Sequence, residues 1–244
     1  MLDQISRFYE SYDEDGRLFR DNVHLPEYLT TIRYFNRLLM PGSRILDACA
    51  GTGRYSFYLS DKGHTVTACD LVEHNVDIIR AKPGADKLAS ISVCNVLDLS
   101  RFQENSFDAV LCMGALYHLN ANDLREKAVS ECTRICIPGG IVIIAYIVQR
   151  EDDSDMSGHT YVPDAYRDVF FGSAPHEIEG ITTKCGLKKL HNIGTDGIIY
   201  NIGSRLKEAS DKEFLDYMED YYLTCEAENN INVSCHGLWI GRKK

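Results

Sequence analysis

Short apolar runs alternate with amphipathic segments through the middle of the chain. Ile, Val, Leu and Cys dominate residues 44–48, 65–69, 91–96, 109–113 and 141–148, with little polar alternation. Strands buried on both faces of a parallel sheet have this continuous apolar character. Apolar side chains also recur at helical spacing between these runs, in residues 55–62, 72–82 and 123–135. The alternation predicts βαβ units and therefore a parallel sheet.

The flanking segments have a different character. Aromatic residues interleaved with acids and arginines fill the stretch before Ser43, which predicts a helical cap. Beyond the fifth apolar run, the pattern predicts a helix, a strand, a helix and a short strand at residues 177–185, 187–193, 211–227 and 238–241. No linker, repeat or low-complexity tract divides the chain. We therefore predict one domain, 1–244, with an N-terminal cap (1–42), a central core (43–148) and two insertions (149–176 and 195–235).

Composition and charge narrow the classes of partner. The 244 residues include 26 basic and 36 acidic side chains, a formal net charge of −10. Such a chain lacks the positive field that gathers phosphate backbones, so we predict no nucleic-acid partner. The longest apolar stretches, residues 109–117 and 141–148, are well short of the ~18 residues of a membrane helix, so we predict no membrane partner. The first residues carry no export signal, and we expect a cytoplasmic protein of undetermined oligomeric state.

The cysteines do not indicate a metal or redox site. Their number, nine, is odd, and no CxxC pair occurs. Cys69, Cys94 and Cys112 fall inside apolar runs, where a thiol acts as a small hydrophobic side chain, so we expect structural thiols there. Residues 153–164 imitate the ligand spacing of a calcium loop, but a probable strand precedes them where a helix is required. We interpret this stretch as a solvated acidic loop and predict no metal.

A glycine-containing turn and three acids indicate a nucleoside site. Gly51 and Gly53 follow the first predicted strand, where glycine lets the backbone approach a ligand and a following helix offers unpaired N–H groups. Asp47 and Asp70 end the first and second strands, and Asp98 lies just past the third. The carboxyl ends of parallel strands meet at one edge of the sheet, so we expect all three carboxylates in a common crevice.

Five segments, in this order, resemble motifs of the class I S-adenosylmethionine (SAM) dependent methyltransferases. They are residues 45–53 (ILDACAGTG), 68–71 (ACDL), 95–98 (NVLD), 107–110 (FDAV) and 137–140 (IPGG). The resemblance covers residues 40–148. It implies an α/β, Rossmann-like, seven-stranded and mostly parallel sheet in the order 3-2-1-4-5-7-6, with helices on both faces and an antiparallel last strand. One departure is Cys49, which stands where the family usually has glycine.

The resemblance also implies SAM as cofactor and a set of residues that bind it. These are Asp47, Ala48, Gly51, Gly53, Asp70, Leu71, Asp98, Met113 and Gly114. Asp47 would anchor the loop and, through water, the cofactor's ammonium group. Asp70 would hold the ribose, Leu71 would pack on the adenine, and Asp98 would accept from the adenine amino group. The carbonyl groups of Met113 and Gly114 would lie near the ammonium group, and the two loop glycines near the methionine moiety.

The acceptor side is predicted from residues outside the sheet core. Methyl transfer from a sulfonium needs an in-line nucleophile about 3 Å away, and a general base only where the acceptor carries a proton. His118 is our candidate base and Tyr117 its catalytic neighbour, although both residues would also suit a pocket wall. Tyr9, Tyr12, His159 and Tyr200 are the candidate substrate-binding residues. For the two N-terminal tyrosines, packing of a helix on the sheet is the alternative.

Three functions remain open at this point. The first is a SAM-dependent methyltransferase that acts on a small molecule. The second is an NAD(P)-dependent oxidoreductase, because Gly51-x-Gly53-x-x-Ser56 and Asp70 also fit a dinucleotide-binding fingerprint. That fingerprint does not account for the other two acids. The third is a module that binds SAM without catalysing transfer.

Overall fold

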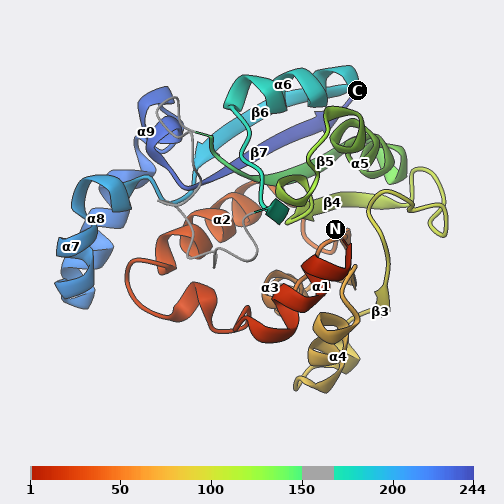
Figure 1. Cartoon of the computed structure of the whole chain (residues 1–244), viewed down its shortest axis with the longest axis horizontal. Coiled ribbons are helices and arrows are strands. Elements are labelled where there is room, and N and C mark those ends of the chain that lie inside the picture. Colours follow the sequence, from red (N-terminus) through yellow and green to blue (C-terminus); the bar gives the residue numbers. More distant parts are fainter. Residues whose placement is uncertain (1, 150–167) are drawn as a thin grey trace.

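The structure, a computed structural model, describes residues 2–149 and 168–244. Within them a seven-stranded sheet has the order β3-β2-β1-β4-β5-β7-β6 (Figure 1). Its strands are β1 (Arg44–Asp47), β2 (Thr65–Asp70), β3 (Ser90–Val93), β4 (Phe107–Met113), β5 (Cys136–Ile147), β6 (Leu187–Gly194) and β7 (His236–Lys243). The first five pair in parallel, and β7 is antiparallel to both β5 and β6. The predicted Rossmann-like class, strand order and antiparallel last strand are confirmed.

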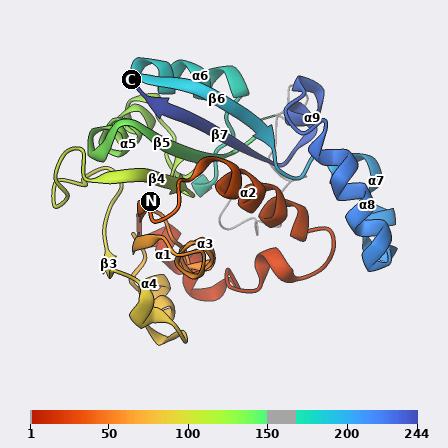
Figure 2. The same cartoon turned by 180° about the vertical axis from the view of Figure 1, so that it is seen from behind.

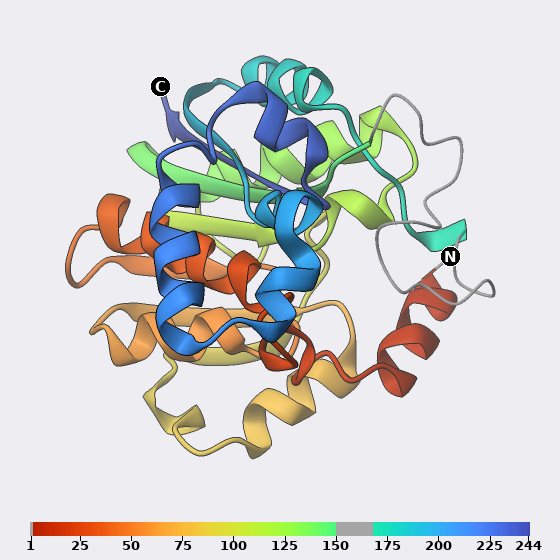
Figure 3. The same cartoon turned by 90° about the vertical axis from the view of Figure 1, so that its left-hand side faces the viewer.

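Helices lie on both sides of this sheet (Figures 1 and 2). The α-helices are α1 (Leu2–Ser11), α2 (Leu25–Leu38), α3 (Arg54–Asp61), α4 (Glu73–Ala81), α5 (Asn122–Ile135), α6 (Pro175–Lys184), α7 (Ile198–Glu208), α8 (Asp211–Tyr222) and α9 (Glu228–Val233). Short 3-10 helices are η1 (Arg17–Phe19), η2 (Ala85–Lys87) and η3 (Leu116–His118). The α7, α8 and α9 helices are grouped at the side of the molecule that faces the viewer in Figure 3.

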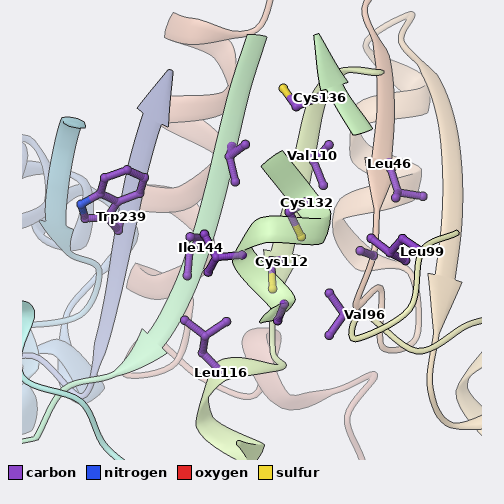
Figure 4. Close-up of a cluster of buried hydrophobic side chains, with 14 of the residues drawn as sticks. Leu46, Val96, Leu99, Val110, Cys112, Leu116, Cys132, Cys136, Ile144 and Trp239 are labelled. Carbon is purple, nitrogen blue, oxygen red and sulfur yellow. The ribbon is translucent and has the colours of Figure 1, made fainter. Parts of the chain in front are cut away.

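Two hydrophobic cores form because successive strand side chains point to opposite faces. Val142 and Ile144 of β5 belong to the core under α5 and α6, whereas Ile143 between them belongs to the core under α2, α3 and α8. Figure 4 shows the first core, where Cys132 of α5 and Trp239 of β7 are fully buried. The continuous apolar runs of the sequence reflect this burial on both faces.

The predicted element bounds fail in three places. The third strand ends at Val93, three residues before the predicted end, because the chain turns there and Asn95 bridges to Asp98. Residues 138–140 lie inside β5 rather than before it, at a register shift opposite Phe107. The helix predicted at 211–227 ends at Tyr222. The division into cap, core and insertions stays a prediction, and much of the first insertion lies outside the described residues.

Candidate functional site

A cavity lies along the carboxyl ends of the parallel strands, the ligand side of this class of fold. The loops after β1 to β4, the N-terminal segment and the start of β7 line it. The predicted site residues that line it are Ala48, Gly51, Asp70, Leu71, Met113, Gly114, Tyr9, Tyr117 and His118. Among the predicted site residues whose side chains the structure describes, four lie outside the lining, namely Asp47, Gly53, Asp98 and Tyr12.

The two loop glycines have different roles. Both have positive φ, 52° at Gly51 and 86° at Gly53, a conformation that favours glycine. Gly51 lines the cavity and donates its N–H to Asp70 at 2.8 Å. A Cβ at Gly53 would lie 3.0 Å from side-chain atoms of Ile79 and Phe57, so this glycine permits close packing of α3. Cofactor approach therefore falls to Gly51.

Asp70 ends β2, and its carboxylate is hydrogen-bonded to the glycine loop. Its Oδ2 accepts the Gly51 N–H, and its Oδ1 accepts from the Val72 N–H and from Asn75 at 2.9 and 3.1 Å. Burial raises the pKa of this carboxyl group. Asp70 also lines the cavity. The predicted ribose contact fits this position and stays a prediction.

Asp47 lies behind the loop. It is 2% exposed, and its Oδ2 accepts from the Ser56 hydroxyl of α3 at 2.6 Å. Burial raises the pKa of Asp47 to about 7. These contacts agree with a role in anchoring the loop, but the prediction that its carboxylate reaches the crevice is wrong in this structure.

Asp98 also lies outside the cavity lining. It is exposed, and its carboxylate accepts the Ser100 N–H at 3.1 Å. Because β3 ends early, Asn95, Val96 and Leu97 reach the cavity in its place. The predicted contact of Asp98 with the adenine amino group is therefore not supported. Asn95 belongs to the same sequence motif, and only the strand end could have distinguished it from Asp98.

Gly114 follows β4 where the chain passes close to the glycine loop. Its φ is 149°, and a Cβ there would lie 3.3 Å from the Tyr117 hydroxyl and 3.6 Å from the Cys49 Cβ. Glycine at this position lets the wall approach the loop closely. Cys49, which departs from the family pattern, lines the cavity without displacing Gly51 from it.

His118, the predicted base, is engaged at both nitrogens. Its Nδ1–H donates to the Val169 carbonyl at 2.7 Å, and its Nε2 accepts from the Tyr9 hydroxyl at 3.1 Å. Burial lowers the pKa of His118 to about 4. A neutral imidazole with no free lone pair holds α1 against η3, so the geometry supports the pocket-wall interpretation rather than the base.

The other predicted acceptor residues are divided. Tyr117 lines the cavity, and burial raises the pKa of its hydroxyl. The ring of Tyr12 instead stacks on Phe8 of α1, with ring centroids 4.9 Å apart, and the ring is therefore used in packing against this helix. Tyr200 belongs to α7. His159 lies outside the described residues, as does the calcium-like stretch.

A cluster of charged side chains that the sequence did not reveal lines one end of the cavity. Arg17 donates to both oxygens of Glu27, at 2.6 and 2.9 Å, and lies 3.5 Å from Glu14. The Nδ1 of His236 lies 2.6 Å from Asp196 and 3.5 Å from Glu27. Four separate segments supply these groups, so no local motif marks them.

Basic and acidic side chains of this cluster stabilise each other's charged forms. The Arg17 and His236 side chains hold the pKa of Glu27 down at about 2, against the opposing effect of burial. Oxygen and nitrogen atoms of Glu27, Asp196 and His236 lie within 4.8 Å of one another, a spacing that a cation would also suit. Because Arg17 already occupies both Glu27 oxygens, we assign no metal ion here.

Two cysteines predicted as free thiols form a disulfide in the structure. Cys69 of β2 and Cys94, just past β3, are bonded, with Cα atoms 5.7 Å apart. Neighbouring parallel strands bring them together although 25 residues separate them in sequence. Cys112 is a buried free thiol, as predicted.

The class of protein follows from this fold and from a family comparison. Residues 46–144 match the family model described as a methyltransferase domain. These residues are therefore identified as a SAM-dependent methyltransferase domain, and SAM is the cofactor that this class of domain uses. The resemblance found in the sequence is confirmed, and the oxidoreductase alternative gains no support.

Curated relatives match about half of the chain. The probable tRNA methyltransferase 9B of Homo sapiens is 34% identical over 113 residues, 46% of this chain and 23% of that protein. The tRNA (carboxymethyluridine(34)-5-O)-methyltransferase of Arabidopsis thaliana is 28% identical over 145 residues, 57% of this chain and 32% of that protein. The ubiquinone biosynthesis O-methyltransferase of Xanthomonas oryzae is 34% identical over 111 residues, 45% of each chain. The chain thus spans only a quarter to a third of the tRNA-related proteins.

Solved structures resemble the whole chain in fold. A chain of the Haloferax volcanii complex between the Trm112 methyltransferase activator and a putative methyltransferase has a TM-score of 0.68 at 20% identity, covering 97% of this chain and 96% of that one. A geranyl diphosphate methyltransferase in complex with GPP and sinefungin gives 0.62 at 16% identity, covering 91% and 79%.

The relatives overturn one prediction from composition. We predicted a small-molecule acceptor and no nucleic-acid partner, but curated relatives include tRNA methyltransferases. Net charge was a poor guide because RNA binding depends on local basic surfaces and on whatever else holds the RNA, whereas −10 is a sum over the chain. Separately, no helix among the described residues is long and apolar enough to cross a membrane.

Proposed function

We propose that this protein transfers the methyl group of SAM to an oxygen atom of an RNA nucleoside. The observation that carries the proposal is one cavity that runs from Gly51 and Asp70 to the charged cluster of Arg17, Glu27 and His236. One end suits an adenosine and the other a polar acceptor. A methyl donor and its acceptor would therefore meet in one enclosed site.

At the cofactor end, the chain offers polar contacts at fixed positions. The Asp70 carboxylate lines the cavity where a ribose hydroxyl would reach it, and Asn95 lines the cavity where the chain leaves β3. Leu71 supplies an apolar contact for a base. When bound, SAM supplies a methyl group already activated on a sulfonium, so the protein mainly positions the reactants and excludes water.

At the acceptor end, the relatives' names favour oxygen. The Arabidopsis protein is named as a 5-O-methyltransferase of a modified uridine in tRNA, and the Xanthomonas protein as an O-methyltransferase. A nucleoside flipped out of its RNA brings a polar face into a pocket, and hydrogen-bonding side chains recognise it there. Tyr9, Tyr117 and the charged cluster provide such groups at this end.

The chain's acidity limits how it would hold RNA. With a net charge of −10, the chain as a whole does not attract an RNA backbone. The chain would contribute the catalytic pocket, and local basic surfaces would hold the RNA phosphates. The basic clusters of the sequence are Lys188-Lys189 and Arg242-Lys243-Lys244. A cytoplasmic location stays a prediction.

Labelled SAM and tRNA from cells that lack this protein test the proposal. After incubation, the tRNA is digested to nucleosides and analysed by mass spectrometry. We expect one nucleoside to gain a methyl group on oxygen, and a smaller gain with Asp70→Ala when SAM is not saturating. Label that enters phenolic acceptors but never tRNA would refute the RNA acceptor. Tight SAM binding without transfer to either would favour the non-catalytic module.

A further inference from the structure

His236 and Asp196 form a carboxylate–imidazole pair beside the cavity. The Asp196 Oδ2 lies 2.6 Å from the His236 Nδ1, and its Oδ1 accepts the backbone N–H groups of Cys235 and His236 at 2.9 and 3.0 Å. The Asp196 side chain is 5% exposed, so the carboxylate is fixed from several directions. An anionic partner places the proton on Nδ1, which leaves Nε2 as the position that exchanges a proton.

The pair lies where the methyl group and its acceptor would meet. His236 pairs with Ile147 across the β5–β7 ladder, so it stands just beyond Ala145 at the carboxyl end of β5. Ala145 in turn pairs with Met113 at the end of β4. His236, Ala145, Met113 and Gly114 all line the cavity. The imidazole of His236 is therefore next to the ends of β4 and β5 that line the cavity.

The charged groups that face His236 suit it to take up a proton. Asp196 precedes α7, Glu27 belongs to α2 and Arg17 to η1. The two carboxylates raise the pKa of His236 above its ordinary value, although burial and Arg17 oppose them. By contrast, both ring nitrogens of His118 are hydrogen-bonded, one to Tyr9 and the other to Val169. Of these two histidines of the cavity lining, His236 has the arrangement of a base.

We infer that His236, oriented by Asp196, is the general base of the reaction and that the acceptor is a hydroxyl group. The inference rests on the proposed oxygen acceptor. The Nε2 lone pair takes the hydroxyl proton while the oxygen forms its bond to the methyl carbon. The carbon–sulfur bond breaks with its electron pair remaining on sulfur. The imidazolium then releases its proton to solvent, which restores the base.

Two substitutions and a matched control test this role with the tRNA substrate above. His236→Gln should lower kcat about 10²–10⁴-fold with an unchanged KM for SAM, and the loss should shrink as rising pH lets hydroxide take the proton. Asp196→Asn keeps an oxygen for the two backbone N–H groups but turns a donor toward Nδ1, so it should also lower kcat. His191→Gln is the control, because His191 pairs with Glu226 at 3.0 Å outside the cavity lining and should keep the wild-type pH profile.

Proton titration of the free protein by NMR separates this inference from the proposed function. We expect a His236 pKa above the ordinary value in the wild type and a lower one in Asp196→Asn. A His236 pKa at or below the ordinary value, or no effect of Asp196→Asn, would overturn the inference whatever the RNA assay shows. A kcat loss in His236→Gln that is equal at every pH would also overturn it, since it would indicate a role that does not depend on the protonation state of the imidazole. Unlabelled RNA with wild-type protein would refute only the proposed function.

Discussion

The ion pair between Arg17 and Glu27 is the interaction whose removal we expect to matter most for stability. It joins η1 to α2 through two hydrogen bonds of 2.6 and 2.9 Å, and its side chains are only 20% and 15% exposed. Glu27→Gln keeps the shape of the side chain and removes its charge. Arg17 would then be a largely buried cation with only the longer contact to Glu14. Breaking one partner of such a pair costs about 3–5 kcal/mol.

The pKa of Glu27 gives an independent magnitude. Its folded-state pKa is about 2, against 4.5 for the free side chain. This difference of roughly 2.5 units corresponds to about 3 kcal/mol of folding free energy from the charged form. Because the folded pKa is depressed, the contribution is complete above pH 4.5 and is lost as the pH falls toward about 2. At pH 3 about 2 kcal/mol of it should already be gone.

Urea unfolding at pH 7 and pH 3 measures both numbers. We expect Glu27→Gln to lose about 3 kcal/mol at pH 7 and about 2 kcal/mol less than that at pH 3. Asp77→Asn, which breaks an exposed pair with Arg80, should lose much less. The double variant Arg17→Met/Glu27→Gln should recover most of the loss, since neither charge of this pair is left without its partner. An equal loss at both pH values would refute the reasoning.

Three further predictions concern the cavity and its loops. Asp70→Ala should weaken SAM binding by about 1.5–3 kcal/mol in calorimetry, and an affinity within twofold of the wild type would contradict the ribose assignment. Gly53→Ala should lower Tm more than Gly63→Ala. The two glycines have nearly the same φ, 86° and 87°, but only Gly53 has side-chain atoms 3.0 Å from an added Cβ. Equal losses of Tm would contradict the packing argument. His118→Gln should lower kcat less than loss of the general base does, and equally at every pH, as a pH-rate profile would show.

Features set by contiguous sequence were predictable. The apolar runs of the central strands are buried on both faces, and this burial determines their composition. Gly51 and Asp70 follow from the same logic, since one lies in the turn after a strand and the other ends the next strand. Parallel pairing then brings both to one edge of the sheet. Local pattern therefore accounts for the cofactor end of the site.

Features that depend on a single strand end or on distant segments were not predictable. Asp98 was assigned to the crevice because β3 was expected to continue past Val93. The strand ends three residues earlier than expected, so Asn95 lines the cavity instead of Asp98. The bond between Cys69 and Cys94 depends on the register of two strands. No periodicity in the sequence carries that register.

The acceptor end differs from the cofactor end in how it is held together. Glu27 contacts Arg17 on one side and His236 on the other, so its position links the N-terminal segment to β7, which lies between β5 and β6. Charges removed from water are stable only while paired, so a shift of the N-terminal segment would unpair groups on β7 as well. Asp70, in contrast, is braced by its own loop and by α4. Substitutions of Glu27 should therefore affect acceptor chemistry more than they affect the adenosine contacts.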